Sequence, residues 1–212
     1  MNLEIKALTP ELEEEYFDFF DNRAFSDGSP YYPCYCNAFN MSKEQIASEL
    51  FGRSKIYGGG ANGWKRALRE SAIQMLRTDA IQGYLAFENG LSVGWCNAND
   101  RMNYFRVGEF DLDNVPSDEA PVDCQQKGLI KSVVCFEIAP EYRRKGIATR
   151  LLEQVCLDAL KDGYILVEAY PAKTGENVGL AFTGTPHFYE KAGFIPFLEQ
   201  DNTIVMRKTL NG

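Results

Sequence analysis

The chain has 212 residues, of which 45% are hydrophobic and 25% charged, and its formal net charge is −8. A chain of this length buries roughly 70% of its unfolded surface on folding, which is enough for a sizeable core. The acidic balance disfavours nucleic acid and anionic membranes as main partners, because both are negatively charged. No apolar run reaches the roughly 20 residues that span a bilayer, and no export signal opens the chain. We expect a cytoplasmic protein, a single domain over 1–212, with its six cysteines reduced.

The N-terminal part predicts a short strand, a helix, an irregular segment and a second, short helix. Residues 2–8 alternate in polarity and predict a short strand. Thr9 followed by Pro10 is typical of a helix start, and apolar residues then recur at helical spacing. Residues 23–41 are aromatic and loop-like. Ser42 and Gln45 have the spacing of a capping box for a short helix to about Phe51.

The stretch "YYPCYCNAF" holds Cys34 and Cys36 among aromatic residues. A zinc site needs four ligands, and the chain has one histidine, His187, and no second cysteine pair of suitable spacing. We predict no metal site. Cys34 and Cys36 are expected to serve in aromatic packing of a loop or in a pocket wall.

The glycine-rich stretch "YGGGANGWK" at 57–65 is not a phosphate loop, because Gly63 is followed by Trp64 and Lys65 rather than by Lys and Ser or Thr. A flexible linker or lid is the better interpretation. An amphipathic helix is predicted to follow from Trp64 to Leu76.

The next elements predict a sheet. Residues 83–87 and 91–96 flank the turn "ENG" and predict a hairpin. Residues 108–128 are polar and predict a surface excursion. Residues 129–138 form a nearly continuous apolar run, as in a central strand buried on both faces, and Glu137 interrupts this run.

The C-terminal part continues the pattern. Apolar residues from Ile147 predict a helix of about four turns that Gly163 ends. Residues 165–169 predict another buried strand, which contains Glu168. Thr185 and Pro186 predict the start of a short helix, and a final hairpin is expected over 194–210.

Between the strand at 129–138 and the helix from Ile147 lies "PEYRRKGIATRLL". The first amides of a helix lack intrahelical partners and, together with the macrodipole, attract anions such as phosphate. Gly146 and Ala148 let a ligand approach the backbone, and Arg143, Arg144 and Lys145 add positive charge. Three cations oppose the helix dipole, so the pattern indicates a pyrophosphate cradle rather than an accidental basic turn.

"RRKGIA" fits the R/Q-x-x-G-x-G/A signature of the GNAT acyltransferase superfamily, which the chain resembles here, with alanine at the last position. "VVCFEIAP" resembles the family's fourth strand, and "HFYEKAGF" (187–194) resembles its C-terminal motif. The resemblance covers 83–212 well and the more variable part, 1–82, only loosely. It implies an α/β fold in which flanking helices cover a central mixed, mostly antiparallel sheet with splayed fourth and fifth strands.

The resemblance also implies a cofactor site. It predicts that acetyl-CoA binds with its pyrophosphate on the signature loop and its pantetheine arm along the fourth strand, near Phe136 and Ile138. The predicted loop residues are Arg143, Arg144, Lys145, Gly146, Ile147, Ala148 and Thr149. A strand N–H is expected to stabilise the developing oxyanion.

Three residues are candidates for proton transfer. Tyr189 stands where the family often has its general acid, and its alternative role is packing. Glu168 and Glu137 interrupt apolar strands, and a buried carboxylate requires a reason. Either is a candidate general base or a partner in a salt bridge, and we rank Glu168 first. His187 is expected to be a surface or capping residue.

The sequence therefore predicts an acetyl-CoA-dependent N-acetyltransferase acting on a primary amine, either a small molecule or a protein group. The alternatives are a non-catalytic acyl-CoA-binding regulatory module and an interaction domain that has lost its ligand. The segments 31–39 and 174–184 are expected to flank the acceptor site, and a homodimer is compatible with the sequence.

Overall fold

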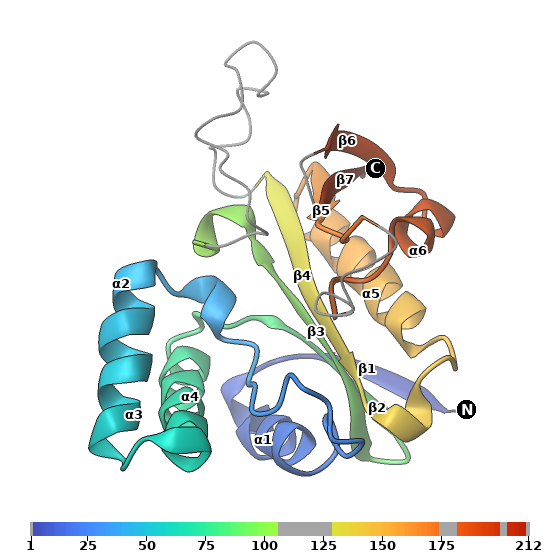
Figure 1. Ribbon diagram of the computed structural model, residues 1–212. Helices are drawn as coiled ribbons and strands as arrows, with labels where there is room; N and C mark the ends of the chain where they lie inside the picture. Colours follow the sequence, from blue (N-terminus) through green and yellow to red (C-terminus); the bar gives the residue numbers. More distant parts are fainter. Residues whose placement is uncertain (1, 106–128, 174–181, 200–202, 211–212) are drawn as a thin grey trace.

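The structure, a computed structural model, describes residues 2–105, 129–173, 182–199 and 203–210 (Figure 1). The excursion predicted at 108–128, most of the segment 174–184 and the turn at 200–202 lie outside the described residues.

A seven-stranded sheet in the order β1-β2-β3-β4-β5-β7-β6 forms the centre of the molecule. Its strands are β1 (Leu3–Ala7), β2 (Gly83–Glu88), β3 (Leu91–Asp100), β4 (Ile130–Ile138), β5 (Leu166–Ala169), β6 (Ile195–Glu199) and β7 (Ile204–Thr209). The pair β4 and β5 is parallel, and the other neighbouring pairs are antiparallel. The mixed, mostly antiparallel sheet predicted from the sequence is thereby confirmed.

The strands β4 and β5 separate partway along their length. Their pairing runs from Ile130 to Val133 on β4 and ends opposite Ala169, whereas β4 continues to Ile138 against β3. The predicted splay is therefore present, and Figure 1 shows β4 continuing past β5 toward the start of α5. In the part of the chain that the structure describes, the second half of β4 has no strand partner on the side of β5.

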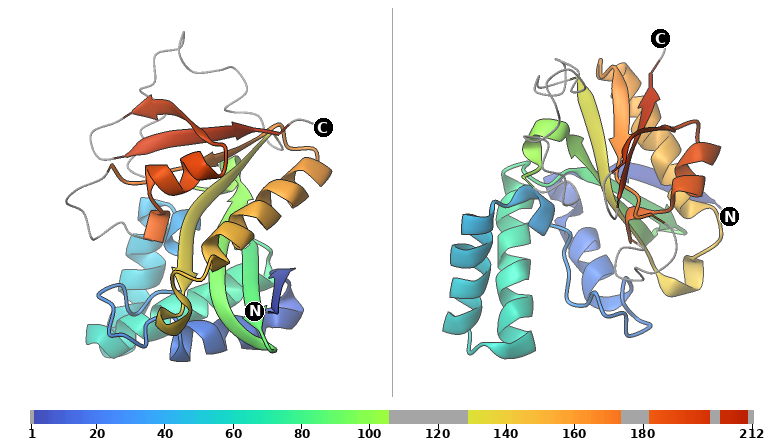
Figure 2. Two further views of the ribbon diagram at one scale, coloured as in Figure 1. Left: turned by 90° about the vertical axis from the view of Figure 1, so that its right-hand side faces the viewer. Right: turned by 45° about the horizontal axis from the view of Figure 1, so that its top comes forward.

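Helices cover both faces of the sheet (Figures 1 and 2). α1 (Glu13–Asn22) and α4 (Gly60–Arg77) contribute to an aromatic core on one face, and α5 (Ile147–Lys161) and α6 (Pro186–Lys191) to an aliphatic core on the other. Neighbouring residues of β2 divide between the cores, with Leu85 in the first and Tyr84 in the second, as strand alternation requires. The shorter elements are η1 (Pro10–Leu12), η2 (Ala38–Asn40), α2 (Lys43–Gln45), η3 (Ile46–Gly52), α3 (Arg53–Ile56), η4 (Arg101–Asn103) and η7 (Pro140–Tyr142).

The N-terminal helices differ in detail from the prediction. Thr9 makes no side-chain cap hydrogen bond, and the chain makes a 3-10 turn at Pro10 before α1 begins. The capping box of Ser42 and Gln45 is present, but the helix continues beyond Phe51, through the π-helical stretch η3, to Ile56. A helix cap depends on residues that are adjacent in the sequence and can therefore be predicted. The continuation of the helix to Ile56 depends instead on its packing against α4.

The glycine stretch is an interhelical turn rather than the predicted flexible linker or lid. Gly58, Gly59 and Gly60 have positive φ, and α4 already begins at Gly60. Gly63 lies in the first turns of α4, where an added Cβ would come within 2.6 Å of the Ser54 carbonyl oxygen. The glycines thus permit a tight turn and a close approach of α3 and α4.

Candidate active site

The turn that leads into α5 has the backbone geometry of an anion cradle. Arg144 and Gly146 both adopt positive φ, at 61° and 81°, and Gly146 is the N-cap of α5. No side chain caps this helix, and its first intrahelical bond at this end joins the Arg150 N–H to the Gly146 carbonyl. The first amides of α5, from Ile147 to Thr149, are therefore available to an anion outside the turn.

The side chains around this turn leave the cradle accessible. A Cβ added at Gly146 would meet no atom within 4 Å, so the space outside the glycine is open. Arg143, Arg144 and Lys145 are exposed, and the Lys145 ammonium lies 4.8 Å from the centre of the Tyr142 ring. Ile147 is buried in the core and fixes the helix start, whereas Thr149 is exposed.

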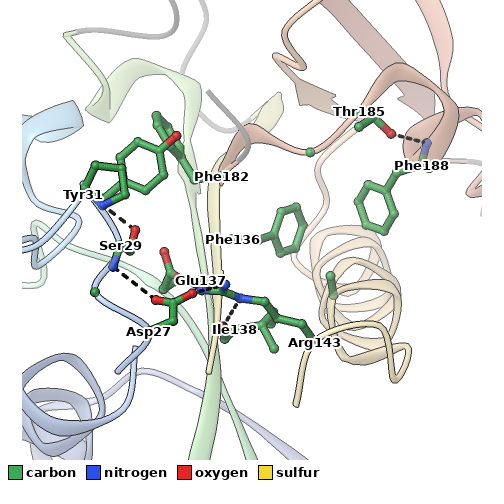
Figure 3. Close-up of a pocket in the computed structure, with 14 residues that line it drawn as sticks. Asp27, Ser29, Tyr31, Phe136, Glu137, Ile138, Arg143, Phe182, Thr185 and Phe188 are labelled. Carbon is green, nitrogen blue, oxygen red and sulfur yellow. Dashed lines mark hydrogen bonds and ion pairs between the residues drawn. The ribbon is translucent and has the colours of Figure 1, made fainter. Parts of the chain in front are cut away.

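A pocket of about 640 Å³ lies in the splay beside the cradle (Figure 3). Its walls come from three segments far apart in the sequence: a loop after α1, the end of β4 with the start of α5, and the chain around α6. The lining residues are Asp27, Gly28, Ser29, Pro30, Tyr31, Phe136, Glu137, Ile138, Arg143, Ala148, Phe182, Gly184, Thr185 and Phe188. The predicted cofactor residues Phe136, Ile138, Arg143 and Ala148 therefore meet in one cavity.

A second pocket, of about 260 Å³, lies on the side of β4 that faces α1 and α4. It is lined by Phe20, Phe25, Tyr31, Pro33, Cys34, Cys36, Asn37, Ala38, Phe39, Trp64, Leu68, Cys135, Glu137 and Phe182. The segment 31–39 thus supplies much of its wall, with Cys34 and Cys36 among the lining residues. Tyr31, Glu137 and Phe182 line both pockets, so the two cavities meet at these side chains.

Glu137 carries the one carboxylate common to both pockets. Its residue is only 8% exposed, and burial raises the pKa of its carboxyl to about 7, although the Arg143 guanidinium favours the charged form. A carboxyl with a pKa near neutrality changes charge at physiological pH, which suits a group that accepts a proton during a reaction.

Arg143 connects the cradle to two carboxylates. Its Nη1 lies 2.5 Å from Asp27 Oδ2, its Nη2 lies 3.4 Å from Glu137 Oε1, and its Nε donates to the Ile138 carbonyl oxygen at 3.0 Å. Figure 3 shows the guanidinium reaching across the end of β4 to these partners. Hydrogen bonding to Arg143 also holds the pKa of Asp27 below its usual value.

Glu168 occupies a different environment. It is 2% exposed and lies in neither pocket as described; its Oε2 is 2.7 Å from Arg207 Nε and its Oε1 is 3.6 Å from Arg101 Nε. The Tyr170 hydroxyl also donates to Oε1 at 2.5 Å. Glu168 thus has the salt-bridge environment that was the alternative to its role as a base, so we take Glu137 as the first candidate base, and both roles stay predictions.

Tyr189 is fully buried against Phe136, Phe188 and Phe194, and its hydroxyl donates to the Thr183 carbonyl oxygen at 2.9 Å. Burial raises the pKa of its hydroxyl well above the usual value. The ring therefore lies one layer behind the described wall of the larger pocket, and its role as general acid stays a prediction.

We expect Tyr189→Phe to lower the free energy of unfolding by about 1–3 kcal/mol, because the buried Thr183 carbonyl loses its donor. Thermal melting measures this effect. Steady-state kinetics measures the other role: a general acid requires kcat to fall while the affinity for acetyl-CoA is kept. An unchanged kcat assigns the side chain to packing.

His187 is not among the described residues that line either pocket. His187 is exposed, and its Nδ1 is 3.6 Å from Glu190 Oε2, as expected for a surface residue.

Within the described ranges, no cluster of three or more histidine, cysteine or acidic side chains has the arrangement of a metal site. None of the helices that the structure describes has the length and apolar character needed to cross a membrane.

Sequence reasoning missed several pocket residues. Asp27 contacts Arg143 across 116 positions of the chain, and no local pattern marks it. Asn37 and Phe182 lie in the segments 31–39 and 174–184 that were expected to flank the acceptor site, but the sequence did not single out either residue. Phe188 lies inside "HFYEKAGF", where its neighbour Tyr189 was the residue singled out.

A splayed pair of strands, with an anion cradle at the following helix start, is the architecture of an acyltransferase of the GNAT type. The family model described as "Acetyltransferase (GNAT) domain" matches residues 82–196, more than half of the chain. The chain belongs to the GNAT acetyltransferase family.

Solved structures share the fold at low sequence identity. An N-acetyltransferase from Thermoplasma acidophilum in complex with coenzyme A is 17% identical, with 99% of each chain covered and a TM-score of 0.50. A GNAT-family acetyltransferase from Streptococcus pneumoniae is 15% identical over 99% of this chain and 100% of its own, with a TM-score of 0.52. The GNAT domain of S. lividans PAT is 14% identical over 98% and 90%, with a TM-score of 0.53. Among curated proteins, none matches the chain.

Proposed function

We propose that the protein is an acetyl-CoA-dependent N-acetyltransferase that transfers an acetyl group directly to a primary amine. One observation carries the proposal: Glu137 lies where a pocket beside the anion cradle meets a second pocket on the other side of β4. A direct transfer needs two substrates to meet, and a proton acceptor at their meeting point serves the attacking amine.

The residues of the larger pocket fit acetyl-CoA. The uncapped start of α5 and the open space at Gly146 suit the pyrophosphate, with Arg143, Arg144 and Lys145 nearby. Beyond Val133, β4 has no strand partner on the β5 side among the described residues, and this edge suits the pantetheine arm near Phe136 and Ile138, since an extended chain can add to a strand edge. The Thermoplasma acidophilum relative with coenzyme A supports the same choice of cofactor.

Acetyl-CoA supplies an acetyl group activated as a thioester: the C–N bond to the amine forms as the C–S bond breaks. Glu137, as a carboxylate, accepts the proton that the amine nitrogen loses. The β4 backbone is the proposed source of an N–H that stabilises negative charge on the carbonyl oxygen, a contribution typically worth roughly 10²–10³ in rate. The departing thiolate keeps the electron pair of the C–S bond.

Thioester consumption in the presence and absence of amines tests the proposal. An enzyme consumes acetyl-CoA only when a suitable amine is present, and an equal amount of N-acetylated product appears. Acetyl-CoA binding without turnover by any amine of a broad panel would instead favour the non-catalytic binding module.

A further inference from the structure

The smaller pocket is lined mainly by aromatic and aliphatic side chains. Its aromatic walls are Phe20, Phe25, Tyr31, Phe39, Trp64 and Phe182. The Phe182 ring packs edge-to-face with Tyr31 at 5.4 Å between centroids and lies 6.2 Å from Phe39. Among the described residues that line this pocket, Glu137 is the single ionisable acid or base apart from cysteine and tyrosine. Such a surface favours an apolar, planar group.

Asn37 is the one amide side chain among the described residues that line this pocket. The side chain is fully buried, and its Nδ2 donates to the Leu68 carbonyl oxygen at 3.1 Å, which fixes the orientation of the amide. Its Oδ1 is buried and has no hydrogen-bond partner in the part of the chain that the structure describes. A buried acceptor without a donor is costly, so a hydrogen-bond donor on a bound molecule would stabilise this side chain.

Size and charge restrict the occupant further. The volume of about 260 Å³ is below the roughly 300–1,000 Å³ of pockets for drug-sized ligands. A polyamine or an aminoglycoside carries several ammonium groups, and the described lining offers one carboxylate. An amino acid would bring a carboxylate of its own, and the described lining offers it no lysine, arginine or histidine.

We propose that the acceptor is a small arylalkylamine, a primary amine with one aromatic ring, and that Asn37 positions it by accepting a hydrogen bond. The ring occupies the aromatic walls, and the amine reaches Glu137 at the junction with the larger pocket. This inference rests on the proposed N-acetyltransferase function and specifies its substrate class.

The first experiment measures kcat/KM for phenethylamine and tyramine beside spermidine, kanamycin and lysine, at saturating acetyl-CoA. We expect the arylalkylamines to exceed the others by about tenfold or more, because the apolar contacts discriminate in their favour. Higher kcat/KM for a polyamine, an aminoglycoside or lysine would overturn the substrate class while leaving the N-acetyltransferase function intact.

Binding is measured separately from turnover, as the melting shift that phenethylamine causes in the protein loaded with coenzyme A. A shift without acetylation of any amine would refute the proposed function and support the pocket's ligand class. The absence of both a shift and turnover with arylalkylamines would refute the substrate class.

Two variants test the site. Asn37→Leu should raise KM for phenethylamine about fivefold to tenfold, with KM for acetyl-CoA unchanged. The amine N–H loses the hydrogen-bond acceptor that Asn37 is proposed to supply. Ala38→Phe adds a ring at a lining position while keeping Asn37, and it should abolish amine binding while acetyl-CoA still binds. Ala61→Phe, at an exposed position of α4, is the matched control. Unchanged amine kinetics in Ala38→Phe would rule out this pocket as the acceptor site.

Discussion

Replacing Glu137 with glutamine is expected to lower kcat/KM about 10²-fold or more at pH 7 to 8, because the amide keeps the size of the side chain but accepts no proton. In the unaltered protein, kcat/KM should rise through about pH 7 as Glu137 loses its proton, and the variant should lack this rise. The defect should shrink again at high pH, where the amine arrives already neutral. Rate measurements from pH 6 to 9 give both profiles.

Melting curves separate this loss from unfolding. The raised pKa of Glu137 means that its protonated form stabilises the fold below the ordinary carboxyl pKa, and this contribution is lost as the pH rises through about 7. Glutamine is neutral at every pH, so at pH 8 the variant should melt no lower than the unaltered protein. A defect of the same size at every pH, together with lower melting, would make Glu137 a structural residue.

Glu168→Gln is the matched comparison, and it should act mainly on stability. A neutral amide leaves Arg207 and Arg101 without their buried carboxylate, and such a loss typically costs about 3–5 kcal/mol. In a chain of this size the cost corresponds to a decrease in melting temperature of roughly 6–20 °C. A selective loss of kcat/KM in Glu168→Gln, with melting unchanged, would instead restore our first ranking of the two glutamates.

Gly146→Glu is expected to abolish the binding of acetyl-CoA. The new side chain enters the open space outside the cradle and places a negative charge where the pyrophosphate is proposed to lie. A ligand at 100 times its Kd stabilises a protein by about 2.7 kcal/mol, so the loss is measurable as a missing melting shift.

Gly163→Glu is the control for backbone strain, because Gly163 has a similar φ of +86° and equally open surroundings at the other end of α5. Both variants should lose stability by about 1–3 kcal/mol, the typical cost of a strained backbone position. Only Gly146→Glu should also lose the acetyl-CoA shift. A full shift in Gly146→Glu would disprove the cradle.

The sequence predicted those parts of the site that depend on local patterns. The cradle was predictable because a helix start, a glycine and a cluster of cations are adjacent in the chain. The splay was predictable only through resemblance, since no periodicity reports where two strands separate. The environment of Glu168 was not predictable, because its partners Arg101 and Arg207 are distant in sequence and marked by no motif. The partner of Glu137, Arg143, lies in the signature, but Asp27, which shares that guanidinium, is distant and unmarked.

Arg143 is a single cation shared between a surface carboxylate and the buried Glu137. An anion in the cradle competes with both for the same guanidinium. Whatever draws Arg143 away from Glu137 removes a favourable charge from that carboxylate, and the group then binds a proton more tightly. Linkage makes the effect reciprocal, so a protonated Glu137 releases Arg143 to the anion and strengthens its binding by the same factor. Cofactor affinity should therefore increase as the pH falls through 7, with uptake of a proton on binding. Glu137 must release that proton before it can accept one from the amine, so binding and turnover should have opposite pH dependences.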